Sequence, residues 1–247
     1  MKYHIHVTFT TARRIIQQLL HDKRTIAIMF IAPTLLISLL WWMFSDNETM
    51  FNSFGPALIG IFPFTVMFLV SSITTLRERV TGTLERLLAM PIGKFDIIFG
   101  YALAFGLFGA IQSLLTSSVA MYLLGLEIVG PQWFFLLIAL VSTLLGVALG
   151  LLVSAFAETE FQAIQFMPIF IFPQIIICGL FVPLEKLPET LEVIARWLPM
   201  TYLVEALNGV TKYATVTETM WRDVWVVVGF IVVALFFAGL TLRRQTK

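Results

Sequence analysis

Six long apolar segments restrict what this chain can fold into more than any other feature of its sequence. Each is close to the ~20 residues that a helix needs to cross a bilayer. Hydrophobic residues make up 59% of the chain and charged residues 13%, which is about half the charged share of a soluble domain. The runs are continuous rather than alternating, which favours helices over the strands of a membrane barrel. We therefore predict an all-α membrane protein with six transmembrane helices, at Ile26–Phe44, Pro56–Leu76, Phe95–Leu124, Gln132–Phe156, Phe161–Val182 and Val224–Leu242.

Lysine and arginine residues gather in three polar parts of the chain. Of the 16 basic residues, five lie in the N-terminal segment, four in the loop after the second apolar segment and three in the C-terminal tail. The other four lie in the last outer loop. Because cytoplasmic loops carry an excess of positive charge, we expect the first three parts, and with them both termini, in the cytoplasm. Their basic residues are Lys2, Arg13, Arg14, Lys23 and Arg24, then Arg77, Arg79, Arg86 and Lys94, then Arg243, Arg244 and Lys247.

Residues 1–25 are mostly polar but carry an apolar stripe at Ile15, Ile16, Leu19 and Leu20. This spacing predicts an amphipathic helix at the cytoplasmic membrane interface, and a solvated leader is the alternative. No small-residue cleavage site follows the first apolar segment, so we expect that segment to stay as a span. Residues 26–247 are then expected to form a single transmembrane domain.

Residues 183–222, between the fifth and sixth apolar segments, are cut by Pro183, Pro188 and Pro199. The segment is too long for a tight turn and not polar enough for a solvated domain. Glu189–Leu198 and Thr201–Tyr213 each have the pattern of a short helix, with Thr201 placed to cap the second. We expect a helical hairpin on or in the outer leaflet, with an ordinary extracellular loop as the alternative.

Within the predicted bounds, Asp96 at the start of the third segment is the only Asp, Glu, Lys, Arg or His in the six apolar segments. Such residues mark proton relays and ion paths, and without a second one the spans offer no acid–base pair and no activated nucleophile. We therefore predict no catalytic residue, no metal site and no cofactor in this chain. It also has no G-x-x-x-x-G-K-[ST] phosphate loop, so energy for uphill transport would have to come from a partner.

Neutral polar and aromatic residues within the spans are candidates for a translocation path, and we single out Phe64, Phe68, Gln112 and Gln174. For the glutamines, the alternative is a hydrogen bond between helices. Small residues four positions apart allow close helix packing, either within the chain or against a second copy. The pairs are Gly146 with Gly150 and Gly100 with Ala104.

The most charged interior stretch, Arg77 to Lys94, reads R-E-R-V-T-G-T-L-E-R-L-L-A-M-P-I-G-K. Gly82 and Pro91 bound a helical unit, Thr83–Met90, in which Glu85 and Arg86 stand beside leucines. A short helix that is apolar on one side could fill a groove on a soluble protein. The alternative is a charged loop that only anchors the ends of two spans.

This stretch and the F-D-I-I-F-G-Y-A-L that follows it resemble the signature of the ABC-2 type export permeases. That signature runs R-E-x-x-x-G-T-L-E-x-L-L-x-x-P through the same loop, and Tyr101 stands where the family usually has lysine. A second stretch, G-L-F-V-P-L-E-K-L-P at 179–188 and W-L-P-M-T-Y-L-V-E-A-L at 197–207, is similar to the family's outer-loop pattern. The resemblance covers essentially the whole chain.

The resemblance implies a homodimer of six-span chains above two separate ATP-binding subunits, which hold the ATP and Mg, in the plasma (inner) membrane of a prokaryote. The region 77–94 would contain the coupling helix, set in a cleft of the ATPase. Its coupling residues would be Glu78, Gly82, Thr83, Glu85, Arg86 and Leu87, with Glu158 and Glu160 forming a smaller second contact. The path would run between the two copies, and the outer hairpin would gate its exit through Glu205, with Trp197 and Tyr202 as further candidates.

The leading hypothesis is therefore the permease subunit of an ATP-driven efflux system for amphipathic or lipid-like substrates, such as drugs, antibiotics, lipids or glycolipids. We expect no nucleic-acid partner. The main alternative is a membrane anchor or regulatory protein that holds a soluble partner through the same loop and transports nothing. A passive channel or scramblase ranks third, and a membrane enzyme last.

Overall fold

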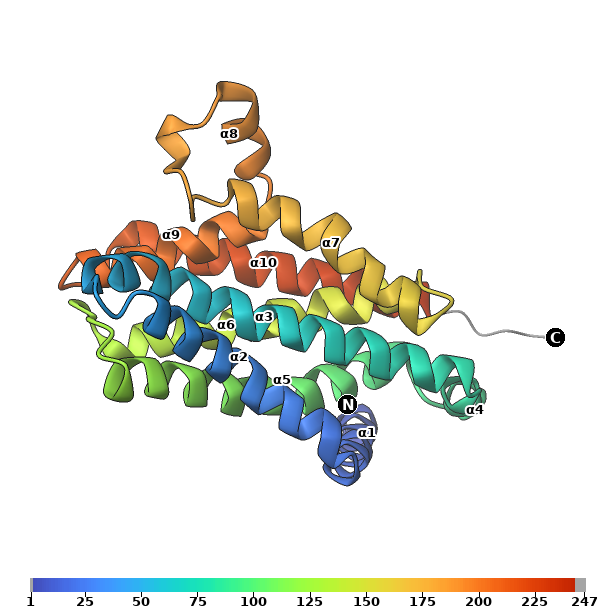
Figure 1. Cartoon of the computed structure of the whole chain (residues 1–247). Coiled ribbons are helices and arrows are strands. Elements are labelled where there is room, and N and C mark those ends of the chain that lie inside the picture. The colour runs from blue at the N-terminus through green and yellow to red at the C-terminus, as the bar shows by residue number, and fades with distance from the viewer. Residues whose placement is uncertain (1, 243–247) are drawn as a thin grey trace.

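The computed structural model describes residues 2–242, and no strand occurs among them. The elements are α1 Lys2–His21, α2 Lys23–Met43, α3 Glu48–Val80, α4 Thr83–Ala89, α5 Lys94–Ser118 with a π-helical turn Val119–Leu123, α6 Gln132–Ser154, α7 Glu160–Ile177, a 3-10 turn Leu184–Lys186, α8 Glu189–Ala195, α9 Pro199–Lys212 and α10 Glu218–Thr241. Six helices are long and apolar enough to cross a membrane, namely α2, α3, α5 with its turn, α6, α7 and α10 (Figure 1). This confirms the all-α, six-span fold class. The tail residues Arg243, Arg244 and Lys247, which supported the predicted orientation, lie outside the described residues.

Several helix ends differ from the predicted bounds because of local capping. Helix α3 starts at Glu48 rather than Pro56, since the side chain of Asn47 accepts a hydrogen bond from the backbone N–H of Met50 at 3.2 Å. Helix α7 stops at Ile177, well before the predicted Val182, and Gly179 follows with a left-handed φ of 89°. A non-glycine residue would be strained there.

Three buried acidic residues lie in the described spans, so the predicted near-absence of charge does not hold. Asp96 already falls within the predicted bounds, and the longer helices add Glu78 and Asp223. Glu78, Asp96 and Asp223 lie near helix ends and are each less than a tenth exposed. Each has a cationic or titratable partner, because a buried carboxylate without one is costly. The ion pairs are Arg14–Glu78 at 2.8 Å, His4–Asp96 at 2.8 Å and Arg222–Asp223 at 2.8 Å.

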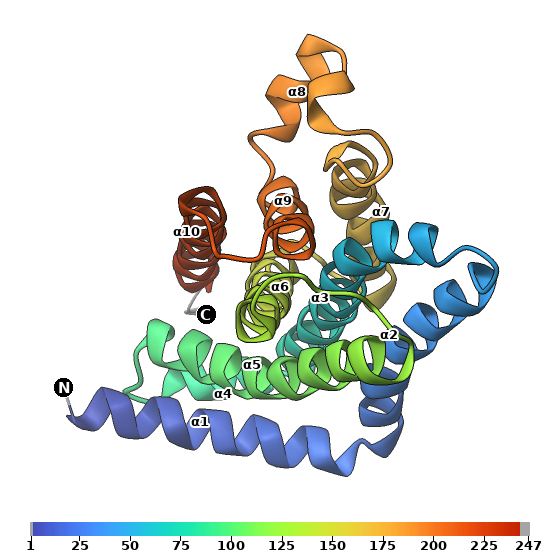
Figure 2. The same cartoon turned by 90° about the vertical axis from the view of Figure 1, so that its left-hand side faces the viewer.

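Helices α3 and α6 form the centre of the bundle, with the other spans around them (Figure 2). They approach most closely where α6 carries Gly146 and Gly150. A Cβ added at Gly146 would lie 2.3 Å from the carbonyl oxygen of Phe64, and one at Gly150 would lie 2.4 Å from that of Phe68. The small-residue pair therefore serves packing within the chain rather than against a second copy.

Helix α1 lies along α5 and crosses the end of the bundle near α4 (Figure 2). Two residues of its predicted apolar stripe, Ile15 and Leu19, are almost fully buried, whereas Leu20 is 55% exposed. Gly100 of α5 lets the helices approach, since a Cβ there would lie 2.6 Å from the side chain of Thr11. The amphipathic helix is thus present, and its place at a membrane interface stays a prediction.

The helices α1 and α4 and the C-terminal end of α10 gather at one end of the bundle, called the α4 end below (Figure 1). In the opposite half, α9 is buried against α3, α6 and α10, while α8 projects from the bundle. Helix α9 begins at Pro199 and not at the predicted Thr201, because the fixed φ of proline suits the first helical position. The hydroxyl of Thr201 instead donates to the carbonyl of Ala195 at 2.7 Å and ties α9 to α8.

The glycine contact between α3 and α6 leads to a direct test. Gly146→Leu should lower the melting temperature of the purified chain, because the new side chain meets the backbone of Phe64. Overpacking of this kind costs about 1–3 kcal/mol, or roughly 2–12 °C for a chain of this size. The matched control is Gly229→Leu in α10, where an added Cβ meets nothing within 4 Å. Equal melting temperatures for the two variants would contradict this packing.

Candidate functional site

The short helix α4 stands apart from the spans at the α4 end, between α3 and α5. Gly82 has a left-handed φ of 73° and lets the chain turn out of α3. Met90 takes an extended conformation before Pro91 and ends the helix after two turns. Leu84 is 2% exposed and Leu88 6%, so the leucine face of α4 points inward.

The charged face of α4 points away from the bundle. Glu85 and Arg86 are exposed, and neither forms an ion pair with any residue in 2–242. Thr83 at the helix start has its hydroxyl 3.2 Å from that of Thr81, and Leu87 is half-buried. Of the predicted coupling residues on or next to α4, Glu85 and Arg86 are therefore the ones whose charges are free to meet a partner.

Glu78, which the sequence groups with them, lies inside the structure and is 4% exposed. Its two carboxylate oxygens accept hydrogen bonds from Arg14 at 3.0 and 2.8 Å, and the hydroxyl of Tyr101 also donates to it. Arg14 donates a further bond to the Tyr101 oxygen at 3.1 Å. This Arg14–Glu78–Tyr101 network joins α1, α3 and α5, so the carboxylate of Glu78 is engaged within the chain.

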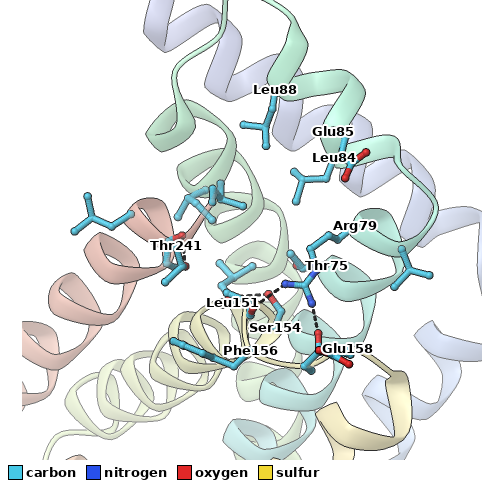
Figure 3. A pocket seen from close by; sticks show the side chains of 17 residues that line it. Thr75, Arg79, Leu84, Glu85, Leu88, Leu151, Ser154, Phe156, Glu158 and Thr241 are labelled. Atoms are coloured by element: carbon cyan, nitrogen blue, oxygen red, sulfur yellow. Dashed lines mark hydrogen bonds between the residues drawn. The ribbon is translucent and has the colours of Figure 1, made fainter. Parts of the chain in front are cut away.

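The turn between α6 and α7, with the predicted second contact, is tied to the end of α3. Arg77 forms a two-pronged ion pair with Glu160, at 2.7 and 3.1 Å. Arg79 donates to the carbonyl of Ala155 at 2.8 Å and to that of Ala157 (Figure 3). Glu158 remains exposed on the turn. The turn and α4 therefore lie at the same end of the bundle.

The predicted path residues lie in the interior of the single chain. Phe64 and Phe68 are each 1% exposed and belong to the apolar core. Gln112 donates to the carbonyl of Met29 at 2.6 Å, which is a bond between α5 and α2. The amide of Gln174 donates to the carbonyl of Phe170 within α7. For Gln112 the structure thus gives the alternative, a hydrogen bond between helices.

The three predicted gate residues differ in their exposure and in their contacts. Trp197 is 77% exposed, and the hydroxyl of Tyr202 donates to the carbonyl of Arg196 at 2.7 Å. Glu205 of α9 is half-buried. Burial raises the pKa of Glu205 above its ordinary value, and the negative charge of Asp223 raises it further.

Sequence reasoning missed Arg14, Tyr101 and Asp223 as partners of these residues. The sequence indicates Arg14 only as one of several basic residues near the N-terminus and Tyr101 only as a departure from a family pattern, and it gives no role to Asp223. The separations of 64 residues from Arg14 to Glu78 and 87 from Arg14 to Tyr101 leave no spacing signal in one sequence. A buried carboxylate needs a cationic partner, but the burial of Glu78 became visible only when the structure showed that α3 extends to Val80.

The arrangement of spans, short helix and turn can be compared with known protein families. A family model described as ABC-2 type transporter matches residues 6–211. The chain belongs to the ABC-2 type transporter family. This membership agrees with the six spans and makes the chain a multi-pass membrane protein of a transporter-permease family.

Curated relatives of this ABC-2 type chain include bacterial and eukaryotic transporters. The probable multidrug ABC transporter permease YbhR of Escherichia coli (strain K12) is 24% identical over 69% of this chain and 46% of its own. The linearmycin resistance permease protein LnrN of Bacillus subtilis (strain 168) is 26% identical, over 74% of this chain and 47% of its own. ABC transporter G family member 20 of Dictyostelium discoideum is 25% identical, over 82% of this chain and 28% of its own. The chain thus spans less than half the length of these relatives.

Breaking the Arg14–Glu78–Tyr101 network should destabilise the chain strongly. Glu78→Ala leaves Arg14, whose side chain is 32% exposed, without its carboxylate partner. Removing one member of a buried ion pair costs about 3 kcal/mol or more, or roughly 6–12 °C in melting temperature at this size. Thermal unfolding of the purified chain in detergent measures the shift.

The matched control for Glu78→Ala is Glu160→Ala, which breaks the Arg77–Glu160 pair, whose side chains are 56% and 49% exposed. Exposed pairs contribute about 0–1 kcal/mol, so this variant should stay within about 4 °C of the wild type. A Glu78→Ala shift no larger than that of the control would contradict the network's role.

Replacing Glu205 should have a pH-dependent effect on stability. Because the pKa of Glu205 is raised in the folded chain, its ionised form disfavours folding above that pKa, and the penalty disappears below the ordinary value of 4.5. Glu205→Gln should therefore melt higher than the wild type near neutral pH and equal it in acid. Glu189→Gln, at an exposed position of α8, is the control. A gain that persists unchanged into acid would contradict this assignment.

Proposed function

We propose that the chain is the membrane-spanning permease subunit of an ATP-driven exporter and that it works with a separate ATP-binding subunit. ATP and Mg belong to that partner. The substrates are amphipathic or lipid-like molecules, such as drugs, antibiotics, lipids or glycolipids. The names of two relatives, a probable multidrug permease and a linearmycin resistance permease, support this substrate class.

One observation supports the proposal above all, which is the division of α4 into two faces. Leu84 and Leu88 hold the helix to the bundle, while the charges of Glu85 and Arg86 have no partner among the described residues. An amphipathic helix presented in this way suits a groove on a soluble protein. Glu158 at the same end adds a second exposed charge for a smaller contact.

A homodimer accounts for the bare faces of two spans. In the most apolar window of α2 and of α7, only 17% of the residues are buried, compared with 61% in α5 and α6. Apolar side chains such as Leu35 of α2 and Ile169 of α7 are 50% and 62% exposed. We propose that part of this surface contacts a second copy and the rest contacts lipid. Since Phe64, Phe68 and Gln112 are packed inside one chain, a transport path between the two copies is favoured over one through a single copy.

The proposed orientation places the α4 end in the cytoplasm, where an ATP-binding subunit would be. The basic residues Arg13, Arg77 and Arg86 lie on elements of this end, in agreement with the excess of positive charge in cytoplasmic loops. Both chain ends would then be cytoplasmic. The Escherichia coli and Bacillus subtilis relatives favour the plasma (inner) membrane of a prokaryote.

A membrane anchor that holds a soluble protein and transports nothing is the second candidate. It is favoured by the tight packing of the predicted path residues, since Gln112, 0% exposed, is used to bond α5 to α2. Such an anchor would use the same face of α4, but amphipathic compounds would not change the ATPase rate of its partner.

The test is to co-express the chain with its candidate ATP-binding subunit, purify the complex through the permease and measure ATP hydrolysis in lipid nanodiscs. Amphipathic compounds should stimulate hydrolysis in the wild-type complex. Glu85→Ala and Arg86→Ala should each reduce the stimulation about tenfold, the loss expected of a charged contact worth 1–2 kcal/mol, while membrane insertion stays unchanged.

Glu185→Ala and Lys186→Ala provide matched controls, because they remove a neighbouring acidic and basic pair at exposed positions away from the α4 end. If both α4 variants keep the wild-type stimulation, the coupling role is wrong. If the complex forms but amphipathic compounds never change its rate, the anchor replaces the exporter.

A further inference from the structure

A cavity of about 830 Å³ lies behind α4, between that helix and the ends of α3, α5, α6 and α10 (Figure 3). Small-molecule sites usually have volumes of about 300–1,000 Å³. Most of its wall is apolar and comes from different elements, with Leu84 and Leu88 of α4, Ile98 of α5 and Leu151 of α6. The inner face of the helix proposed to meet the ATP-binding subunit therefore lines a cavity as well as packing against the bundle.

One hydroxyl in this cavity has no hydrogen-bond partner among the described residues. Thr75 of α3 is 4% exposed, and its Oγ1 is buried and unpaired. The other hydroxyls of the lining are satisfied within their own helices, since Ser154 donates to Leu151 at 2.7 Å and Thr241 to Ala238 at 2.9 Å. A buried polar group usually has a partner, and Thr75, a residue of the cavity lining, has none for its hydroxyl.

The charged residues of the cavity lining differ in burial. Arg79 is half-buried, and its bonds to the carbonyls of Ala155 and Ala157 hold the guanidinium in place. These bonds use two of five N–H donors, so others are available to an anion. Glu85 and Glu158 are exposed and lie on the rim, on two different elements (Figure 3).

A cation inside and two carboxylates at the rim complement a molecule that has both charges. A purely anionic head would meet Arg79 but would be repelled by the rim. A purely cationic head would meet the rim but would leave Arg79 without an anionic partner. A phosphate next to an ammonium group, followed by a hydrocarbon chain, satisfies all three parts.

We propose that this cavity binds a zwitterionic phospholipid with a primary ammonium head, taken from the surrounding bilayer. The phosphate is held by Arg79 and by the Thr75 hydroxyl, and the ammonium group lies between Glu85 and Glu158. The acyl chain runs along Leu84 and Leu88. This site goes beyond the proposed transport function, because it makes a lipid part of the support of α4 whether or not the chain exports anything.

The test uses the purified permease alone in detergent, without ATP or an ATP-binding subunit. The probe is a lysophosphatidylethanolamine with a photoreactive acyl chain, and labelled residues are identified by mass spectrometry. We expect labels on α4 and the end of α10. Unlabelled lysophosphatidylethanolamine should block them at a concentration at least about tenfold lower than lysophosphatidylglycerol or a long-chain alkylamine, since each competitor lacks one of the two charged contacts.

Three sets of substitutions distinguish specific lipid binding in the cavity from non-specific binding to apolar surfaces. Thr75→Val should weaken probe binding about threefold to tenfold without lowering the melting temperature of the ligand-free chain, because the lost hydroxyl has no partner there. Glu85→Gln combined with Glu158→Gln should remove the preference for lysophosphatidylethanolamine over lysophosphatidylglycerol. Thr241→Phe should block the cavity, whereas Val233→Phe, at a position of the same helix that is 52% exposed, should not.

Equal competition by the three amphiphiles would overturn the proposal, and so would labels spread over the exposed faces of α2 and α7. Unchanged binding in both Thr75→Val and Thr241→Phe would also overturn it and would leave water as the partner of Thr75. None of these outcomes bears on ATP coupling, so failure of the lipid site and failure of the exporter proposal are told apart.

Discussion

The buried pairing of Arg14 with Glu78 is the interaction on which the α4 end depends. Glu78 is 4% exposed, and a carboxylate so deeply buried is tolerated only when its charge and hydrogen bonds are met. Arg14 and Tyr101 meet them from α1 and α5. Because Glu78 lies only a few residues before Gly82, the start of α4 is fixed relative to both helices. A push on α4 would therefore move α1 and the ends of α3 and α5 together.

Packing in the spans relies on shape, because lipid chains are as apolar as the side chains and do not drive helices together. Gly146 and Gly150 let α6 approach the backbone of α3, and Gly100 does the same for α5 and α1. These contacts give the chain a rigid centre. By contrast, few residues of α2 and α7 are buried. The surfaces left for lipid or for a second copy therefore lie on the spans with the least internal packing.

Hydropathy predicted all six spans, and turn chemistry predicted α4, since Gly82 and Pro91 bound it within one residue of its observed end at Ala89. Prediction failed where a long-range or capping contact decides the outcome. Asn47 extends α3 back into what the composition indicates as a loop. The burial of Glu78 could not be seen in a stretch whose neighbours Glu85 and Arg86 are exposed, because one sequence contains no signal for a partner 64 residues away.

Helix α3 connects the two halves of the molecule as one continuous helix, although its two prolines would favour a break. It runs unbroken from Glu48 to Val80, 33 residues, or ~50 Å at the usual rise of an α-helix, although it contains Pro56 and Pro63. Its last turn holds Glu78 and leads into α4, while its first half packs against α9, which bears Glu205. The helix end that leads into α4 and the segment near Gly60 that packs against Leu207 of α9 are therefore parts of one continuous element.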